Sequence, residues 1–309
     1  MNTKKDRAIV VSALKHAAPY IRLFKNKVFV IKAGGEIFAD AGQTSAFMEQ
    51  VGLLHQVGIR VVLIHGGGPQ STKLAAALGL DTQFIEGRRV TDGASLDVAT
   101  MVLNGQINTR ILATCRDLQI PAVGMSGVDA GLIRAHPRPP VERDGEDTVD
   151  YGFVGDIDGV DADVLRKQLD NGLMPVISPL SCDESGTLLN INADTVAAAI
   201  AAELDAEKLI LATGAAGILE DITDPRSLIS YMDRASLKKL KASGSLADGM
   251  LPKAAAIDAA LANGVQRVHV ISYKLADSLL LEVFTNEGTG TLVVDDTAAL
   301  TPAEQGDSS

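Results

Sequence analysis

Two short, uninterrupted apolar runs, each followed at once by glycines, constrain this chain more than any other feature. Residues 28–31 (VFVI) lead into Lys-Ala-Gly-Gly, and residues 60–64 (RVVLI) lead into His-Gly-Gly-Gly. Continuous rather than alternating apolar residues are typical of parallel strands that are covered on both faces. Ligands bind outside the carboxyl ends of such strands, and glycines let backbone amides approach an anion. The two clusters therefore predict a phosphate site at one edge of a parallel sheet.

The rest of the chain alternates between apolar runs and segments with helical periodicity, which predicts an α/β class with a largely parallel, open sheet. Strands are expected at 28–31, 60–64, 122–124, 174–177, 208–212 and 268–271, and residues 290–294 are expected to end the fold. Helices are expected at 6–24, 44–57, 70–79, 94–117, 161–172, 195–204, 236–241, 254–263 and 275–284, the first bent or divided by Pro19. Residues 134–153 carry three prolines and several charges, so we expect a surface hairpin or loop there.

Composition excludes several classes of protein. With 28 basic and 39 acidic residues the net charge is −11, which argues against a general binder of nucleic acid or of anionic membranes. A small anionic ligand in a local basic pocket remains compatible with this charge. The two cysteines lack metal-site or disulfide spacing, and no apolar run has the length of a membrane span. No secretion signal is recognisable, so we expect a cytoplasmic protein.

Two lysines are candidates for phosphate binding. Lys32 ends a strand beside two glycines, which favours a phosphate-binding role over a plain surface position. Lys253 stands at the start of a helix, where a cation opposes the helix dipole. An anionic ligand would remove that conflict, and a solvated lysine is an equally weighted alternative.

A carboxylate and an arginine complete the candidate set. Asn190, Asn192 and Asp194 alternate before a helix, where Asp194 is a plausible N-cap and also a carboxylate that can orient lysines. Arg89 could bind a carboxylate with two nitrogens, although paired arginines on a loop are more often solvated.

Together these stretches resemble the amino acid kinase family, and within it the kinases that act on N-acetylglutamate. The matching stretches lie between about Lys27 and Val294, in the family's order: VIKAGGE, VVLIHGGGPQ, GRRVTD, FVGDI, NINAD, DGMLPK and SLLLEVFTNEGTGTLV. The resemblance implies an open αβα sandwich with an acyl-amino-acid-binding lobe over 26–180 and a nucleotide-binding lobe over 181–294. We expect residues 1–25 to form a helical arm before these lobes and residues 295–309 a disordered acidic tail.

The resemblance also implies a reaction: ATP, with Mg²⁺, phosphorylates the side-chain carboxylate of N-acetyl-L-glutamate in arginine biosynthesis. Lys32 and Lys253 would be catalytic, and Asp194 would hold both. Substrate would be bound by Gly67, Gly68, Arg89, Asn190 and Asn192, and nucleotide or phosphate by Gly34, Gly35, Gly214, Gly249 and Met250. A carboxylate nucleophile is already ionised at neutral pH, so no general base is required. The histidines show no ligand spacing, and we assign no metal-binding residue.

Some features depart from this pattern. Gly214 stands where the family often has an aspartate, which bears on ATP binding. The stretches IRLFKNKVFVIKAGGE, LLHQVGIRVV, VDYGFVGDID and VHVISYK also resemble the kinase-like domain of N-acetylglutamate synthase. Synthase-type domains often lose the active-site lysine and the glycine trio, and their retention here favours a working kinase. A non-catalytic arginine-binding regulatory module and a kinase for another N-acylated amino acid are the alternatives.

The arm carries an apolar stripe formed by Ile9, Val10, Ala13, Leu14, Ala17 and Ile21. Such a stripe needs a partner surface, either on another copy or on its own subunit. The arm resembles the extra helix that interlaces dimers into a hexamer in arginine-inhibited members of the family. The resemblance therefore implies a homo-oligomer, a hexamer or a dimer, and an L-arginine site near Tyr20, Glu282, Gly288 and Gly290. Asp277 stands where inhibited relatives often carry histidine.

Overall fold

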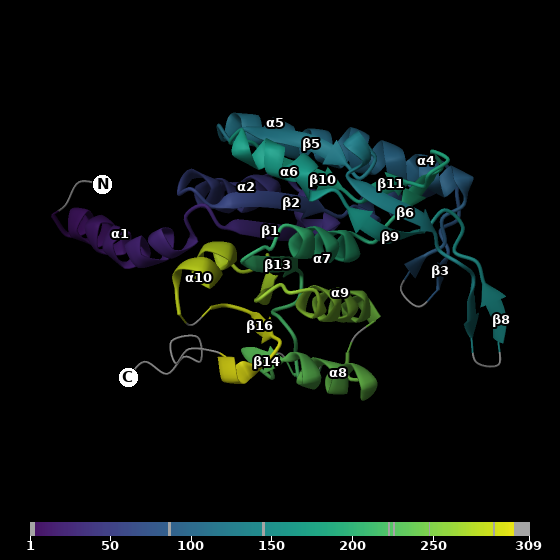
Figure 1. The fold of residues 1–309 in the computed structure, drawn as a ribbon. Helices are drawn as coiled ribbons and strands as arrows, with labels where there is room; N and C mark the ends of the chain where they lie inside the picture. The colour runs from purple at the N-terminus through teal and green to yellow at the C-terminus, as the bar shows by residue number, and fades with distance from the viewer. Residues whose placement is uncertain are drawn as a thin grey trace.

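The structure, a computed structural model, describes residues 4–299 apart from residues 86, 87, 144, 145, 222, 225, 247 and 287. An eight-stranded sheet runs through its centre (Figure 1). In spatial order its strands are β14 (Tyr231–Asp233), β16 (Thr291–Val294), β15 (Val268–Ser272), β13 (Lys208–Thr213), β1 (Val28–Ala33), β2 (Arg60–His65), β10 (Met174–Ser178) and β5 (Ala122–Ser126). Neighbours are parallel except β15 and β16, so the predicted largely parallel sheet is confirmed. The six expected strands are all present in this sheet, whereas β14 and β16 were not predicted as strands.

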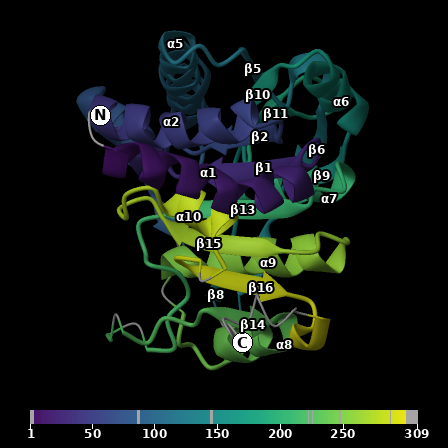
Figure 2. The ribbon, with the colours of Figure 1, turned by 90° about the vertical axis from the view of Figure 1, so that its left-hand side faces the viewer.

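Helices cover both faces of the sheet, as expected for an αβα sandwich (Figure 2). One face carries α6 (Ala162–Asp170), α7 (Ala193–Glu203), α8 (Arg234–Ala242) and α9 (Leu251–Ala262). The other carries α2 (Ala41–Gln56), α3 (Gly68–Ala77), α4 (Gly93–Thr100), α5 (Thr109–Asp117) and α10 (Ser278–Phe284). Short 3₁₀ turns η1 (Gly35–Phe38), η3 (Asp129–Gly131), η4 (Asp248–Met250) and η5 (Thr297–Ala299) lie between or after these elements.

The strand β1 serves both layers of the sandwich. Val30 belongs to the apolar core on the side of α7 and α9, whereas Phe29 and Ile31 belong to the core on the opposite side. Side chains alternate along a strand, so Lys32 faces the same layer as Val30. The same alternation in β2 directs His65 to the opposite layer. The alternation of side chains along β1 and β2 thus determines which helices can contact Lys32 and which can contact His65.

The helix expected over residues 94–117 is present but is not uniform. Between α4 and α5 the backbone forms a π-helix, η2 (Met101–Asn108). Long π-helices are rare and often lie at functional sites. The periodicity of the apolar residues gives no sign of this change, because the segment keeps its buried side toward the sheet throughout.

Smaller sheets flank the main one. A four-stranded sheet has the order β12 (Leu188–Asn190), β11 (Leu180–Cys182), β6 (Ile133–Pro137) and β9 (Gly155–Val160). Two hairpins, β3 (Phe84–Ile85) with β4 (Arg88–Arg89) and β7 (Val141–Arg143) with β8 (Glu146–Val149), complete the strands. The surface hairpin expected within 134–153 is present as β7 and β8, which project from the body in Figure 1. The expectation is wrong for residues 134–137, which belong to β6 of the four-stranded sheet.

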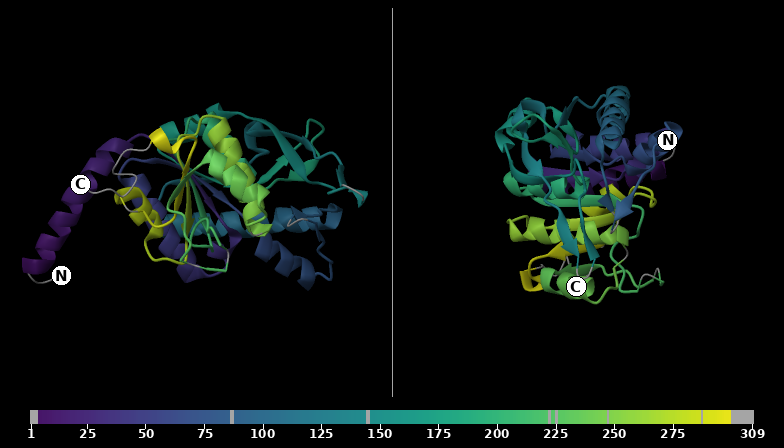
Figure 3. Two further views of the ribbon diagram at one scale, coloured as in Figure 1. Left: turned by 90° about the horizontal axis from the view of Figure 1, so that it is seen from below. Right: turned by 90° about the vertical axis from the view of Figure 1, so that its right-hand side faces the viewer.

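The arm forms one helix, α1 (Lys4–Phe24), that continues through Pro19 rather than dividing there. It extends away from the rest of the molecule (Figures 1 and 3). Ile9, Val10 and Leu14 are 57%, 39% and 62% exposed. Within the described residues this part of the stripe does not pack on its own subunit, because the first half of α1 projects away from the rest of the chain.

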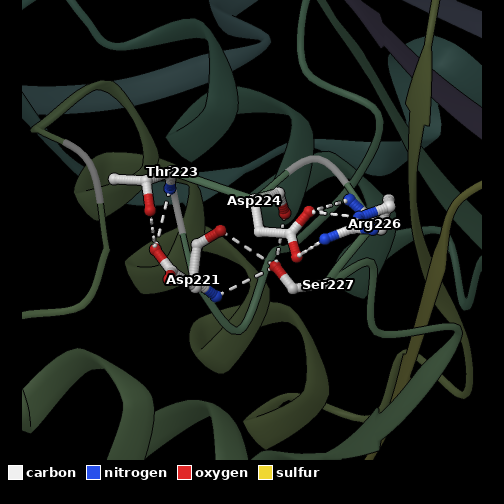
Figure 4. A network of polar contacts seen from close by, with 5 residues as sticks. All are labelled: Asp221, Thr223, Asp224, Arg226 and Ser227. Atoms are coloured by element: carbon white, nitrogen blue, oxygen red, sulfur yellow. Dashed lines mark hydrogen bonds and ion pairs between the residues drawn. The ribbon is translucent and has the colours of Figure 1, made fainter.

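The loop between β13 and β14 is held by its own side chains (Figure 4). The carboxylate of Asp221 accepts hydrogen bonds from the backbone and hydroxyl of Thr223, and Asp224 pairs with Arg226. None of the described helices has the length and hydropathy of a membrane span. Of the expected acidic tail, residues 300–309 lie outside the described residues.

Candidate functional site

A cleft of about 600 Å³ opens at the carboxyl ends of β1, β2 and β13, the edge at which the glycine clusters predict a ligand. Three buried ionic side chains line it. Lys32 Nζ lies 2.9 Å from Asp194 Oδ1, and Lys253 Nζ lies 3.3 Å from Asp194 Oδ2. The side chains of Lys32, Asp194 and Lys253 are only 8%, 5% and 15% exposed. One carboxylate thus serves two ammonium groups, and the surplus positive charge suits an anionic ligand.

The protonation of this trio follows from burial and mutual charge. Burial opposes ionisation of Asp194, but the positive charges of Lys32 and Lys253 outweigh it and hold the pKa of Asp194 below its usual value. Burial lowers the pKa of Lys253, and the charge of Lys32 lowers it further, while Asp194 opposes the shift. Among the described residues, Asp194 Oδ1 has no donor of good hydrogen-bond geometry, so its contact with Lys32 is chiefly electrostatic.

The local sequence explains why Asp194 can reach the lysines. Asn192, not Asp194, caps α7, because its side-chain oxygen accepts from the N–H groups of Asp194 at 2.8 Å and Thr195 at 3.2 Å. The expected N-cap role of Asp194 is therefore wrong. Asp194 lies in the first turn of α7, where the helix dipole favours a carboxylate. Lys253 lies in the first turn of α9, and Asp194 offsets its conflict with that dipole.

The two glycine clusters meet because β1 and β2 are neighbours, with Ala33 opposite His65. A Cβ atom added to Gly35 would lie 2.9 Å from Gly67 Cα and 2.7 Å from Gln70 Oε1. Only glycine permits this approach without displacing backbone. Gln70 Nε2 donates to Gly35 O at 2.5 Å and holds the first loop against the second. Five glycines of these loops line the cleft: Gly34, Gly35, Gly66, Gly67 and Gly68.

Arg89, Asn190 and Asn192 also line the cleft. Arg89, at the end of the β3–β4 hairpin, donates from Nη2 to Thr72 Oγ1 at 2.6 Å and to Gly68 O at 3.2 Å. Its guanidinium carbon lies 4.9 Å from the ring centroid of Phe84. Burial lowers the pKa of Arg89, but a guanidinium begins so basic that it stays charged. Arg89 Nη1 also donates to Thr82 Oγ1 at 3.2 Å, so three hydrogen bonds hold the guanidinium and fix its positive charge at the edge of the cleft.

Gly214 and Gly249 line the cleft, whereas the side chain of Met250 packs against the core beside α9. A Cβ atom on Gly214 would lie 3.4 Å from Tyr273 Oη and 3.6 Å from Lys274 Nζ. A side chain at residue 214 would thus contact two groups that themselves line the cleft. Where a carboxylate is expected from the resemblance, this chain has a tyrosine hydroxyl and a lysine within reach.

Several residues that line the cleft were not predicted from the sequence, among them Glu36, Arg138, Tyr273 and Lys274. Tyr273 and Lys274 follow β15, which pairs with β13, so the strand-end rule that found Lys32 could have found them. Arg138 could not be found that way, because its place depends on β6 and on its ion pair with Asp156 of β9.

The residues expected to bind arginine lie together but outside the cleft. Tyr20 Oη of α1 donates to Asn286 Oδ1. Glu282 of α10 is buried, and its carboxylate accepts from Thr289 N at 2.6 Å and Gly290 N at 3.2 Å and pairs with His269 Nδ1 at 2.6 Å. A Cβ atom on Gly288, which has φ +61°, would lie 3.0 Å from Glu282 Oε2.

Comparison with known proteins gives consistent matches. The model of the amino acid kinase family matches residues 27–272. An acetylglutamate kinase of Myxococcus xanthus is 46% identical over 293 residues, which cover 93% of this chain and 95% of the relative. Another, of Symbiobacterium thermophilum, is 45% identical over 289 residues, 94% of this chain and 98% of the relative.

Solved structures agree on the architecture. N-acetylglutamate synthase from Neisseria gonorrhoeae, complexed with coenzyme A and L-arginine, superposes with a TM-score of 0.81 at 30% identity and covers 93% of this chain. This chain spans 65% of that synthase chain. Carbamate kinase from Giardia lamblia bound to AMP-PNP has a TM-score of 0.61 at 18% identity, covering 88% of this chain and 99% of that one. At that identity the likeness concerns the fold alone.

Proposed function

Because the chain belongs to the amino acid kinase family, we propose that it transfers the γ-phosphoryl group of ATP to the side-chain carboxylate of N-acetyl-L-glutamate, giving N-acetyl-L-glutamyl 5-phosphate and ADP. This is the step of arginine biosynthesis that the names of its relatives imply. The observation that carries the proposal is the trio of Lys32, Asp194 and Lys253 beside two glycine loops. The cytoplasmic location expected from the sequence stays a prediction.

Phosphoryl transfer to a carboxylate needs positive charge and fixed hydrogen-bond donors, and residues of the cleft supply both. The nucleophile is a carboxylate, ionised at neutral pH, so the barrier is chiefly the repulsion between two anions and their alignment. Lys32 and Lys253 neutralise charge on the transferring phosphoryl group, and Asp194 keeps both ammonium groups aimed at it. Backbone N–H groups of Gly35, Gly67 and Gly68 add hydrogen bonds fixed in advance, which is how preorganised sites stabilise transition states.

The two substrates would enter from opposite halves of the sheet. The acyl amino acid fits the half formed by residues 26–180, where Arg89 supplies a guanidinium for its α-carboxylate. Asn190 and Asn192, at the start of the segment 181–294, supply amides from the border between the two halves. The nucleotide fits the half formed by residues 181–294, near Gly214, Gly249 and Lys274. Gly249 has open space around it, and Gly214 lies close to Lys274. The cleft volume of about 600 Å³ lies in the range of small-molecule sites.

Magnesium would accompany the nucleotide. Within the described part of the chain no group of three His, Cys, Asp or Glu side chains could hold a metal ion. Phosphate oxygens and water therefore supply most of its ligands, and Glu36 is the lining carboxylate not already paired with the lysines. The ion supplies charge neutralisation on the phosphates when it is bound.

An assay with a substrate panel tests the function. The full chain is incubated with ATP, Mg²⁺ and N-acetyl-L-glutamate, N-acetyl-L-aspartate, an N-acylated aminoadipate or free L-glutamate. We expect ADP release and a hydroxamate, formed by trapping the acyl phosphate with hydroxylamine, with N-acetyl-L-glutamate only. A preference for the longer substrate would assign another acyl-amino-acid kinase, and no turnover with arginine binding intact would assign the regulatory module.

Arg89→Lys tests the acyl end of the cleft. An ammonium cannot make the forked contact with a carboxylate, so we expect KM for N-acetyl-L-glutamate to rise by about tenfold or more while KM for ATP changes little. The matched control is Arg226→Lys, since Arg226 is 90% exposed in the loop of Figure 4 and should leave both constants unchanged. Equal effects on the two substrates would contradict the assignment.

The projecting arm points to a homo-oligomer. Ile9, Val11 and Leu14 of α1 are all more than half exposed and no described part of the chain covers them. Burying such side chains yields about 1.5–3 kcal/mol each, so a second copy of the chain is the natural partner. We propose assembly through α1, as a hexamer or a dimer, with L-arginine as an effector bound near Tyr20 and Glu282. The synthase solved with L-arginine shares this fold.

Leu14→Ser tests the assembly while leaving Tyr20 and the buried Phe24 in place. Loss of an apolar contact at each copy should produce smaller species by light scattering at unchanged protein concentration. Any inhibition by millimolar arginine should fall with it. Leu78→Ser is the control, because Leu78 is 56% exposed at the end of α3, far along the chain from the arm. A wild-type chain that is monomeric and insensitive to arginine would remove both proposals.

A further inference from the structure

A chain of buried polar contacts connects β10 to the second glycine loop. Asn108, the last residue of the π-helix η2, donates from Nδ2 to Val176 O of β10 at 2.9 Å. The same nitrogen lies 3.2 Å from His65 Nε2. His65 Nδ1 lies 3.2 Å from Gly66 O, and the imidazole is fully buried. None of these groups carries a role in the mechanism described above.

The directions of these hydrogen bonds follow from one fixed acceptor. A backbone carbonyl can only accept, so Val176 O orients the Asn108 amide with its NH₂ group toward β10 and His65. The second hydrogen of that group then faces His65 Nε2, which must be unprotonated to accept it. A neutral imidazole has its one proton on the other nitrogen, so Nδ1–H donates to Gly66 O. Burial lowers the pKa of His65 to about 4, which keeps the ring neutral at physiological pH.

We propose that His65 is a positioning residue that orients the peptide between Gly66 and Gly67 so that the N–H of Gly67 faces the phosphoryl group in the cleft. In a trans peptide the carbonyl and the following N–H point in opposite directions, and no described peptide bond is cis. Drawing Gly66 O toward buried His65 therefore turns Gly67 N–H the other way. The inference rests on the proposed function in one respect, namely that the group bound by Gly67 N–H is a phosphoryl group.

Packing supports the same orientation. A Cβ atom on Gly67 would lie 2.7 Å from Leu103 Cδ2 and from Ile107 Cδ1, both in η2. The π-helix thus presses on the loop with two side chains and directs His65 with a third. Gly67 lines the cleft, and within the described residues its N–H has no backbone partner. Glycine has wide conformational freedom, so a peptide between two glycines needs such outside restraint to stay in one orientation.

The tautomer is measurable without any activity. In full-length protein labelled with ¹⁵N at histidine, the His65 signals, assigned by their loss in His65→Asn, should show a protonated Nδ1 and an unprotonated Nε2. Asn108→Ala should release this preference, and Asn104→Ala, in the same helix, should not. An Nε2–H tautomer or a charged imidazolium in the wild type would overturn the inference, even for an active kinase.

Kinetics separate positioning from packing. His65→Leu keeps the volume but has no donor, and we expect kcat to fall by about 10²-fold, the scale for loss of one preorganised donor. His65→Asn places an amide nitrogen where Nδ1 stood and should recover most of the loss, with KM for ATP little changed in both variants. If folded His65→Leu kept wild-type kcat, or if the asparagine gave no recovery while melting like the wild type, His65 would be a packing residue only. These ratios apply to whichever acyl amino acid the panel assay selects.

Discussion

Replacing Lys32 with methionine is expected to lower kcat for N-acetyl-L-glutamate phosphorylation by about 10²-fold or more, the scale for loss of a preorganised charged donor. Lys32 is the penultimate residue of β1, just before the glycines, and its side chain is 8% exposed beside Asp194. Little water is available there to replace its charge as the phosphoryl group moves. The effect should fall on kcat more than on either KM, since the charge acts on the transferring group rather than on the ends of the substrates.

The fold of Lys32→Met should survive, because Asp194 keeps Lys253 as a partner and methionine fills the space of the lysine stem. Lys27→Met is the matched control: Lys27 precedes the same strand, its side chain is 52% exposed, and it pairs with Glu207 at 3.2 Å. The test is to measure steady-state rates and thermal melts of the wild type, Lys32→Met and Lys27→Met. A near-normal kcat in a folded Lys32→Met enzyme would refute the catalytic role.

The main features of the fold were predictable because they depend on local patterns. A strand covered on both faces must be apolar throughout, so β1, β2, β10, β13 and β15 were recognisable from their composition alone. The strand-end rule then placed Lys32 and both glycine clusters at one edge. Parallel neighbours bring such ends together whatever lies between them in the chain.

Partnerships across layers were not predictable in the same way. The sequence allowed Asp194 either to cap α7 or to orient lysines, because asparagine and aspartate can both cap a helix, and only the structure shows that Asn192 is the cap. Arg138 and Asp156 come together through the pairing of β6 with β9, and the spacing of apolar residues in the sequence did not predict that pairing. The π-helix has no signal in hydrophobic spacing, yet it places Asn108 against His65.

The arm shows another kind of information that the sequence does not contain. Its apolar stripe was readable, and so was the need for a partner, but a stripe does not reveal which surface covers it. The structure favours a partner surface on another molecule, because the first half of α1 is exposed, while Tyr20 near its end donates to Asn286 just after α10. Conversely, Glu282 was expected to be available for a guanidinium, and its carboxylate already binds His269 and two backbone N–H groups. An arginine bound there would add to these partners or displace some of them.

Asp194→Asn is expected to be the most damaging single change in the cleft. It leaves two lysine side chains, 8% and 15% exposed, without the carboxylate that both contact, and removing one partner from a buried ion network costs about 3–5 kcal/mol. We expect a lower melting temperature in the absence of ligand and a loss of kcat at least as large as that of Lys32→Met. Asp183→Asn, in the turn between β11 and β12, is the control, because Asp183 lies outside the lining of the cleft.

The pH and ligand dependence of this variant distinguish loss of charge from general damage. The pKa of Lys253 is already lowered by burial and by the charge of Lys32, and without Asp194 only the charge of Glu36 still opposes that shift. The unfolded chain then binds more protons than the native state, so the stability of Asp194→Asn should rise as pH increases through the folded pKa toward the unfolded one. Phosphate or ADP, bound between the two cations, should raise its melting temperature more than that of the wild type. A variant equally unstable at all pH values, and no more responsive to phosphate or ADP than the wild type, would mean that Asp194 supports the fold without holding the two lysines.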